Sequence, residues 1–342
     1  VKVLKPNILI TSPMSSAYVE KLNADPKINQ AKQLPRELWS KFAEFYHLGE
    51  KVSEIGPQEF APFFEEADVI VCVGLPYRSI EWSPNLKWVQ AWSAGVDHMK
   101  ISGVLDAGIP ITTLAGLNAI PVAEHVMMFI LMLAKKYNTF SENARNRIWR
   151  PAPATDEING KTVGIFGLGA IGKHVARMAK SFNMNVIATK RTINESDRNL
   201  ENVDELIQTT EFDDLISRSD YLVLSCPLSD ETRGIMNEEK FKKMKPESYL
   251  INVARGEVVD EQALVKALKE KWIAGAGLDV FLNEPLEEES ELWVQPNLIA
   301  TSHRAGRSTS QQSRATELFE KNLDLLINGE PLINVVDVNR QY

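Results

Sequence analysis

A glycine-rich loop between an apolar run and a helical pattern constrains the fold of this chain most strongly. Residues 162–166 read TVGIF, and a helical pattern with apolar residues at 171, 175, 178, 179 and 182 begins at Ala170. In a strand–loop–helix unit, three glycines permit a tight turn, a close approach of backbone amides to a pyrophosphate, and close packing of helix on strand. The pattern therefore predicts a dinucleotide site at Gly167, Leu168, Gly169, Ala170, Ile171 and Gly172.

Strand-like and helical patterns continue to alternate after this loop. Strands are expected at 162–166, 185–189, 221–225, 249–252, 274–278 and 298–301, with helices at 170–182, 213–218, 238–244 and 260–270. Short apolar strands separated by helices predict a parallel sheet covered on both faces. Six strands with helical crossovers are typical of a complete Rossmann domain.

The N-terminal third carries a second series of the same kind. Its strands are expected at 7–10, 69–73, 86–89 and 109–112, with helices at 15–22 and 37–45. Pro121 suits the first turn of a long helix over 121–137, and a last helix over about 308–328 precedes an extended tail at 332–338. We expect this tail to return to the first domain.

The predicted fold class is α/β, with two doubly wound parallel-sheet domains. An outer, flavodoxin-like substrate domain comprises residues 1–117 and 308–342, and an inner Rossmann cofactor domain comprises 118–307. Ligands of open parallel sheets bind beyond the carboxyl ends of the strands, so the active site is expected in the cleft between the domains.

Composition excludes several functional classes. A net charge of −8 provides no basic face for nucleic acid. Cys72 and Cys226 stand far apart, without the spacing of a metal site or of a disulfide framework, which favours the reducing cytoplasm and no metal. The apolar run 120–134 is too short to cross a membrane, and the chain start reads as a strand rather than a secretion signal.

The end of the second Rossmann strand indicates which dinucleotide is bound. An NAD site usually carries an acidic residue there, which accepts a hydrogen bond from the ribose 2′-hydroxyl. This chain has Lys190, Arg191 and Thr192 instead, and Lys190 lies 18 residues past Gly172. Cations attract a 2′-phosphate, so the pattern favours NADP over NAD, although two solvated cations on a loop would look the same.

Three polar residues follow strands of the predicted cofactor domain and suit the reduction of a 2-keto acid. The guanidinium of Arg255 matches a carboxylate and can polarise the neighbouring carbonyl. His303 can donate a proton, and Glu284 can favour its charged form. Each residue alone has an ordinary structural explanation, but their shared position at strand ends points to one site.

Several blocks of the chain together resemble the D-isomer-specific 2-hydroxyacid dehydrogenase family over nearly the whole length. They are SAGVDH at 93–98, NAIPVAEH at 118–125, GLGAIG at 167–172, NVARGEVVDEQAL at 252–264, GLDVFLNEPL at 277–286 and PNLIATSHRAG at 296–306. The resemblance implies that Arg255, Glu284 and His303 are the catalytic set. It also implies that amides around Ala94, Gly95 and Val96 bind the substrate carboxylate.

The same resemblance assigns further residues to the cofactor. Asp279 is implied to orient the nicotinamide carboxamide, and the remaining cofactor-lining positions are Cys226, Pro227, Val253, Ala254 and Gly306. Ser302 and Arg304 depart from the usual neighbours of the histidine; Arg304 could bind an acidic substrate group, although we favour a structural ion pair. Tyr77, Trp149 and Trp293 are candidates for shaping the pocket, or are plain core or dimer contacts.

The leading hypothesis is a reductase that converts glyoxylate, hydroxypyruvate or a similar 2-keto acid to the D-2-hydroxy acid with NADPH. Lys190 resembles the NADPH-using branch of the family. One alternative is a phosphoglycerate-dehydrogenase-like NAD enzyme, although we expect no appended regulatory domain. Another is a dinucleotide-sensing corepressor-like binding protein; formate oxidation is disfavoured because that branch pairs its histidine with glutamine. The consecutive apolar residues of helix 121–137 and the resemblance both predict a homodimer through the cofactor domains.

Overall fold

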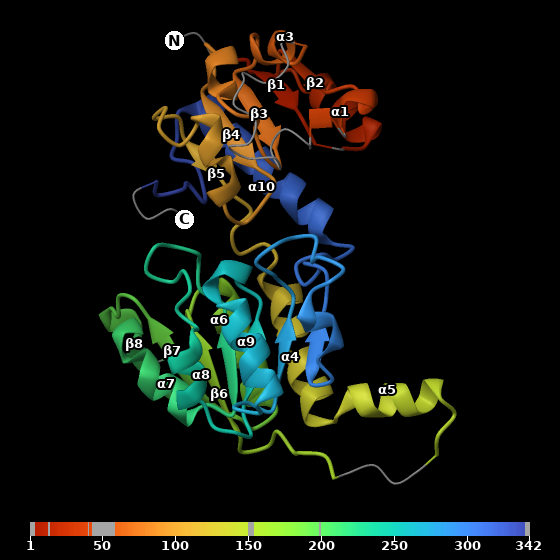
Figure 1. The fold of residues 1–342 in the computed structure, drawn as a ribbon. Helices are drawn as coiled ribbons and strands as arrows, with labels where there is room; N and C mark the ends of the chain where they lie inside the picture. Colours follow the sequence, from red (N-terminus) through yellow and green to blue (C-terminus); the bar gives the residue numbers. More distant parts are fainter. Residues whose placement is uncertain are drawn as a thin grey trace. The chain divides into compact units, whose positions relative to one another are not determined.

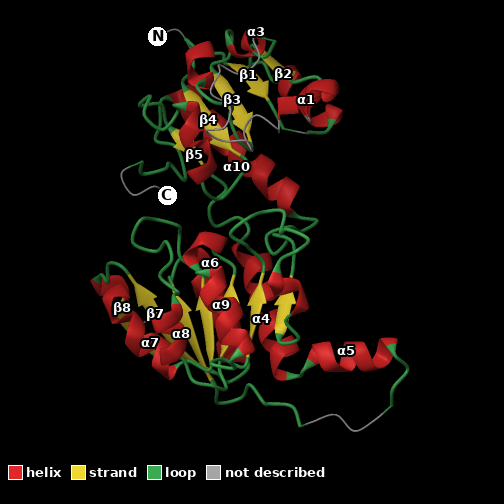
Figure 2. Cartoon of the chain, viewed as in Figure 1, coloured by secondary structure: helices red, strands yellow, loops and turns green. Residues whose placement is uncertain are grey.

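The computed structural model describes residues 4–12, 14–39, 41–42, 59–149, 154–197 and 200–338. The chain divides into two compact units, Val1–Leu117 with Thr309–Tyr342 (unit 1) and Asn118–Ser308 (unit 2). Each unit is a parallel sheet with helices on both faces, as the helices and strands of Figures 1 and 2 show. The predicted α/β class with two parallel sheets is confirmed.

Unit 1 contains a five-stranded sheet in the order β2-β1-β3-β4-β5, which is the flavodoxin-like order. Its strands are β1 (Asn7–Ile10), β2 (Gln30–Gln33), β3 (Val69–Cys72), β4 (Trp88–Ala91) and β5 (Ile111–Thr112). Its α-helices are α1 (Ser16–Ala24), α3 (Ala61–Phe64) and α10 (Gln311–Asn328), and short 3-10 helices lie at Arg36–Leu38, Ser79–Trp82 and Asp97–Ser102.

Alternating side chains of the unit 1 strands enter two separate cores. Ile8 and Ile10 pack with Phe319 of α10 on one face, whereas Leu9 between them joins the other face. Successive side chains point to opposite faces of the sheet, and both faces are buried. The strands therefore read as continuous apolar runs. The C-terminal tail lies beside β5, where Val335 pairs with Thr112 in an isolated antiparallel bridge, so the predicted return of the tail is confirmed.

Unit 2 contains a seven-stranded sheet in the order β12-β11-β10-β9-β6-β7-β8, which is the Rossmann order with one further strand. Its strands are β6 (Thr162–Phe166), β7 (Asn185–Lys190), β8 (Glu205–Gln208), β9 (Tyr221–Leu224), β10 (Tyr249–Asn252), β11 (Gly275–Leu278) and β12 (Leu298–Ala300). Its α-helices are α4 (Ala119–Ala134), α5 (Tyr137–Arg145), α6 (Ala170–Ser181), α7 (Phe212–Arg218), α8 (Glu238–Lys243) and α9 (Glu261–Lys269). Short 3-10 helices lie at Glu195–Asp197, Thr209–Glu211, Gly256–Val258 and Glu291–Val294.

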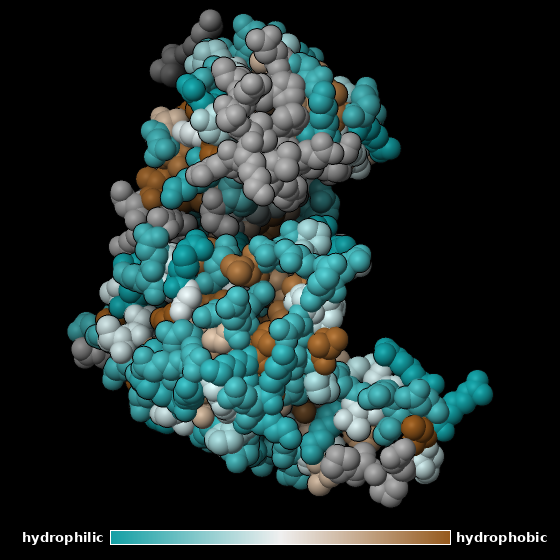
Figure 3. Space-filling view, in the orientation of Figure 1, coloured by the Kyte–Doolittle hydropathy of each residue, from teal (hydrophilic) through white to brown (hydrophobic). Residues whose placement is uncertain are grey.

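Helices cover both faces of this second sheet. Side chains of α4 and α6 form one core, and side chains of α7, α8 and α9 form the other. In the view of Figure 3 the surface of unit 2 is mostly hydrophilic, as expected when the apolar residues of doubly covered strands lie inside.

Two strands were missed by the sequence analysis, and both lie at a sheet edge. β2 reads QAKQ and buries only Ala31, and β8 reads ELIQ and buries only Ile207. An edge strand is held by backbone pairing on one side and does not need an apolar run. The expectation of six strands in the cofactor domain was therefore wrong by one.

The predicted helix 121–137 is in fact two helices. Lys136 adopts a left-handed conformation with φ of 52°, which separates α4 from α5. α4 is buried within its own unit, where it packs against α6. Ile120 and Met128 are the exposed large apolar side chains of α4. Tyr137 and Phe140 are exposed on α5, a helix that projects from the body of unit 2 (Figure 1). Of the predicted helix 37–45, residues 40 and 43–45 lie outside the described residues.

Candidate functional site

The glycine loop connects β6 to α6, as the sequence analysis predicted. Gly167 has φ of 102°, and a Cβ atom there would lie 2.8 Å from the Cα atom of Cys226. A Cβ atom on Gly172 would lie 2.6 Å from the Gly167 carbonyl oxygen. Gly169 faces open space instead, because apart from its own chain neighbours no atom of the described residues lies within 4 Å of a Cβ position there. Two glycines therefore close the turn, and the third leaves the backbone accessible to a ligand.

Neighbouring strand ends hold this loop in place. The Gly167 amide donates to Thr189 Oγ1 at 3.2 Å, and the Leu168 amide donates to the Thr189 carbonyl at 2.8 Å. Ser225 Oγ donates to the Gly167 carbonyl at 2.9 Å. The loop opens the 12-residue helix α6, whose first amides have no partner within the helix and whose dipole favours an anion. This geometry fits a dinucleotide pyrophosphate.

The basic residues at the end of β7 and directly after it are engaged in ion pairs. Lys190 Nζ contacts both carboxylate oxygens of Asp197 at 2.6 and 2.7 Å. That hydrogen bond is the main reason why the pKa of Asp197 is lowered. Arg191 Nη2 lies 2.9 Å from Glu231 Oε1, and both of these side chains are exposed. The Asp197 carboxylate therefore lies next to Lys190, at the strand end where an NAD site usually carries an acidic residue. The sequence analysis did not predict this contact.

Arg255 follows β10 and is positioned by a buried asparagine. Asn252 Nδ2 donates to the Arg255 carbonyl at 2.9 Å, while Asn252 Oδ1 accepts from the Ala254 amide at 3.0 Å. The Arg255 side chain donates from Nη1 to the Ala254 carbonyl at 2.9 Å. Asn252 was not identified from the sequence, although a polar residue at the end of a buried strand was a usable signal.

Glu284 and His303 form a hydrogen-bonded pair. Glu284 Oε2 accepts from His303 Nδ1 at 2.7 Å, and Glu284 Oε1 accepts from the Phe281 amide at 3.0 Å. Burial is the largest single influence on the pKa of this carboxyl and opposes its ionisation, whereas the hydrogen bonds from His303 and the Phe281 amide favour the charged form. The positive charges of His303 and Arg255 act in the same direction, and the pKa of Glu284 is lowered. With Nδ1 donating to the carboxylate, Nε2 is the ring nitrogen left to exchange a proton.

Asp279 lies buried beside this pair and is already hydrogen-bonded within the chain. Its Oδ1 accepts from Thr301 Oγ1 at 2.6 Å and from the Arg304 amide at 2.8 Å. Its Oδ2 accepts from the Ala305 amide at 2.9 Å. The Arg304 side chain is exposed and has no ion pair among the described residues, so the structural pair that we favoured is not seen in that part of the chain.

The other cofactor-lining candidates also lie at strand ends of unit 2. Cys226 and Pro227 follow β9, and burial raises the pKa of the Cys226 thiol to about 12, which leaves it protonated. Val253 and Ala254 are buried after β10. A Cβ atom on Gly306 would lie 3.3 Å from Asn118 Nδ2, so the loop passes close to the start of α4.

The candidate carboxylate-binding residues lie in unit 1. Ala94, Gly95 and Val96 form the turn after β4, where Ser93 Oγ donates to the Gly95 carbonyl at 2.7 Å. Of the pocket candidates, Tyr77 is half-buried, whereas Trp149 and Trp293 are exposed.

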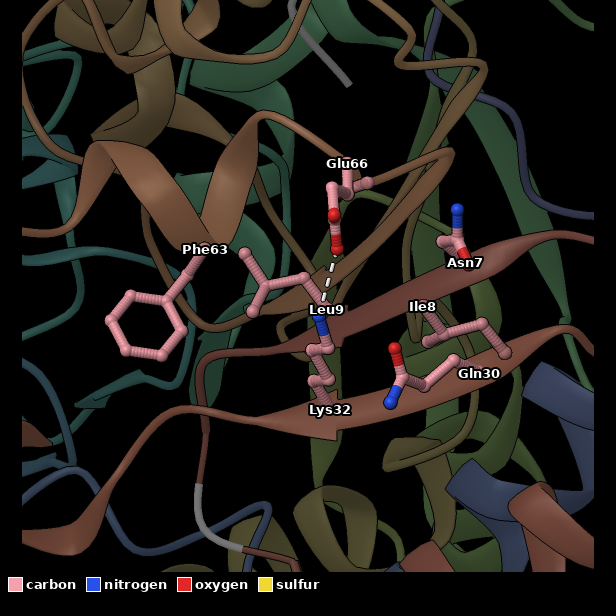
Figure 4. Close-up of a pocket in the computed structure, with 8 residues that line it drawn as sticks. Asn7, Ile8, Leu9, Gln30, Lys32, Phe63 and Glu66 are labelled. Atoms are coloured by element: carbon pink, nitrogen blue, oxygen red, sulfur yellow. Dashed lines mark hydrogen bonds and ion pairs between the residues drawn. The ribbon is translucent and has the colours of Figure 1, made fainter.

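A small pocket in unit 1 lies away from all of these residues. It is lined by side chains from β1, β2 and the segment around α3, and the Lys32–Glu66 ion pair crosses it (Figure 4). Its volume of about 10 Å³ is the space of a single water molecule, so it is too small for a keto acid.

Within the described ranges no group of three or more potential metal ligands converges, and no helix is long and apolar enough to cross a membrane.

Comparison with known proteins agrees with this geometry. The model of the D-isomer specific 2-hydroxyacid dehydrogenase NAD-binding domain matches residues 127–305. A glyoxylate reductase of Thermofilum pendens is 33% identical, covering 90% of this chain and 93% of that protein. A glyoxylate reductase of Pyrococcus horikoshii is also 33% identical, covering 96% and 94%.

A solved structure is similar over the full length. The NADPH-dependent glyoxylate/hydroxypyruvate reductase of Sinorhizobium meliloti, in complex with NADP and sulfate, has a TM-score of 0.80 at 26% identity, covering 99% of this chain and 100% of that one. The fold and the site at the strand ends of unit 2 together define an NAD(P)-binding oxidoreductase. The chain belongs to the D-isomer specific 2-hydroxyacid dehydrogenase family.

Proposed function

We propose that this enzyme reduces a small 2-keto acid, such as glyoxylate or hydroxypyruvate, to the D-2-hydroxy acid. The observation that carries the proposal is the 2.7 Å hydrogen bond between Glu284 and His303, made beside the charge of Arg255. A carboxylate that holds Nδ1 leaves Nε2 as the proton donor, which is what reduction of a carbonyl requires. The names of the relatives support the substrate class.

The residues divide the work by their chemistry. Arg255 binds the substrate carboxylate and stabilises the negative charge that develops on the carbonyl oxygen. His303 donates its proton to that oxygen, and Glu284 stabilises the imidazolium beforehand. The turn amides of Ala94, Gly95 and Val96 bind the carboxylate as well. In the reverse direction His303 is the base.

We propose that a dinucleotide binds along the glycine loop, with its pyrophosphate near the open face of Gly169. When bound, it supplies the hydride. Asp279 orients the carboxamide, and residues 226–227, 253–254 and Gly306 line the ring. We favour NADP because Lys190 and Arg191, although paired with Asp197 and Glu231, supply cations at the position where an NAD site usually carries an acid, and because the Sinorhizobium meliloti reductase was solved with NADP.

We propose a homodimer formed through unit 2 and a cytoplasmic location. Tyr137 and Phe140 expose 50% and 45% of their surface on α5, which projects from its unit (Figure 1). A second copy would cover these rings. Light scattering tests the assembly, and a monomer at micromolar concentration would refute it. The unpaired, buried state of Cys72 and Cys226 suits a reducing compartment.

One experiment tests the catalytic proposal as a whole. The purified chain is incubated with a panel of 2-keto acids, in parallel with NADPH and with NADH, and oxidation of the dinucleotide is followed. We expect turnover with glyoxylate and hydroxypyruvate and a higher kcat/KM with NADPH. Absence of turnover with every keto acid would overturn the proposal and favour a dinucleotide-sensing binding protein.

A further inference from the structure

A second histidine stands behind the proposed proton donor. His125 projects from α4, and its Nε2 atom lies 2.9 Å from Thr301 Oγ1. Its side chain is only 17% exposed, and its ring meets the Phe129 ring edge to face at 4.7 Å. His125 is therefore held in a single orientation by the body of unit 2, and it has no part in the chemistry proposed above.

The directions of the hydrogen bonds follow from counting protons. Thr301 has one hydroxyl proton, which it donates to Asp279 Oδ1 at 2.6 Å. Its oxygen can then only accept from His125, so Nε2 of His125 carries a proton. Burial lowers the pKa of His125, against the attraction of the Asp279 carboxylate, so the ring is neutral. The chain of donors runs from His125 through Thr301 to Asp279.

Asp279 in turn determines the path of the segment that carries His303. Its carboxylate binds the amides of Arg304 and Ala305, and its carbonyl accepts from the His303 amide at 2.8 Å. His303 adopts a left-handed conformation with φ of 51°. A non-glycine residue in this region persists when its surroundings hold it there, and such residues cluster at functional sites.

We propose that His125 and Thr301 are positioning residues, which fix the Asp279 carboxylate and thereby hold His303 where Nε2 can reach the substrate. This inference rests on the proposed reductase function. The alternative is an ordinary core hydrogen bond that contributes only to stability. The two differ in what a hydroxyl deletion does: positioning affects kcat, whereas a purely structural role affects only the unfolding midpoint.

Thr301 offers a matched pair of variants. Thr301→Val keeps the shape but removes the hydroxyl, and Thr301→Ser keeps the hydroxyl. We expect Thr301→Val to lower kcat by about ten- to a hundredfold, because small misplacements of a reacting group cost rates of this order. Dinucleotide affinity should fall much less than kcat, and Thr301→Ser should restore most of the lost turnover. Equal kcat in the two variants would overturn the inference.

A spectroscopic readout separates this inference from the proposed function. Nitrogen-15 spectra of protein labelled at histidine should show His125 as the neutral Nε2–H tautomer, assigned by its loss in His125→Gln. The ring signals of His303 should shift in Thr301→Val and return toward their original positions in Thr301→Ser. These signals do not depend on turnover. If the wild-type protein proved inactive, the proposed reductase function would be refuted, and the spectra would still test whether Thr301 positions His303.

A second pair of variants, at His125, tests the same inference if Thr301→Val fails to fold. The side-chain amide of His125→Gln can still donate to Thr301, whereas His125→Leu cannot. We expect the Leu variant to lose kcat, or the corresponding His303 shift, to a clearly greater extent than the Gln variant. The opposite order, or no difference, would show that His125 is only a packing residue.

Discussion

Gly256 lies against the backbone of Phe281 so closely that no side chain fits between them. A Cβ atom on Gly256 would overlap the Phe281 carbonyl group and the Leu282 amide. These residues follow β10 and β11, which are neighbours in the parallel sheet. The contact brings the segment of Arg255 against the turn that carries Glu284, and the charge of Arg255 contributes to the lowered pKa of Glu284.

Gly256→Ala should therefore damage both the fold and the site. Because the overlap is with backbone, no rotamer change relieves it, and we expect a loss of about 1–3 kcal/mol or more in the free energy of unfolding. Turnover should fall further than the folded fraction does, because the two strand ends are pushed apart. Urea unfolding and activity measured on the same samples check this, and an unaltered midpoint would contradict it.

Gly167→Ala and Gly169→Ala should separate folding from cofactor binding. The first places Cβ 2.8 Å from the Cys226 Cα atom at a φ of 102°, so it should destabilise the protein. The second meets no protein atom and has an ordinary φ of −85°, so the fold should tolerate it. Its methyl group would nevertheless occupy the space proposed for the pyrophosphate. We expect a normal unfolding midpoint with dinucleotide affinity reduced about tenfold or more, as measured by fluorescence titration; undiminished affinity would place the pyrophosphate elsewhere.

Glu284→Gln should change the pH dependence of turnover. The lowered pKa of Glu284 means that the carboxylate is ionised at neutral pH and becomes protonated only below its usual range. An anion beside the imidazole favours the protonated ring, which is the proton donor. Without it the protonated donor is no longer stabilised, so the alkaline decline of kcat should move to lower pH by on the order of one unit. Superimposable profiles would exclude Glu284 from this role.

The glycine loop and most strands were predictable because their signals are local. The apolar run of β6 followed by Gly167 needs no tertiary information, and the buried strands read as continuous apolar segments. β2 and β8 were missed because their stability comes from pairing with a neighbour rather than from their own side chains. The break at Lys136 was missed because no glycine or proline marks it.

The site residues were predictable in part for a different reason. Arg255, Glu284 and His303 stand at strand ends, which a doubly wound sheet gathers at one edge. Contacts among distant segments could not be read from the sequence. His125 is 176 residues from Thr301, and Asp197 meets Lys190 only because the loop after β7 folds back. Such contacts change the role expected of a residue without leaving a local pattern.

His303→Ala should abolish the proposed proton donor. We expect kcat to fall by about two to four powers of ten, the usual contribution of general acid catalysis. Dinucleotide affinity should stay near the wild-type value, because the ring is assigned to the substrate. Stopped-flow turnover and a binding titration on one preparation test both statements, and near-normal turnover would remove His303 from the mechanism.

Asp197→Asn should strengthen the preference for NADPH. The Asp197 carboxylate neutralises Lys190 through contacts of 2.6 and 2.7 Å, so its removal frees the ammonium to attract a 2′-phosphate. An ion pair of this kind contributes little, so we expect a modest rise, about two- to fivefold, in the NADPH/NADH ratio of kcat/KM. Lys190→Gln is the matched opposite and should lower that ratio; it is cleaner than Lys190→Asp, which would place two carboxylates together. If neither variant alters the ratio, the phosphate is recognised by other residues, and the preference for NADP cannot be attributed to Lys190.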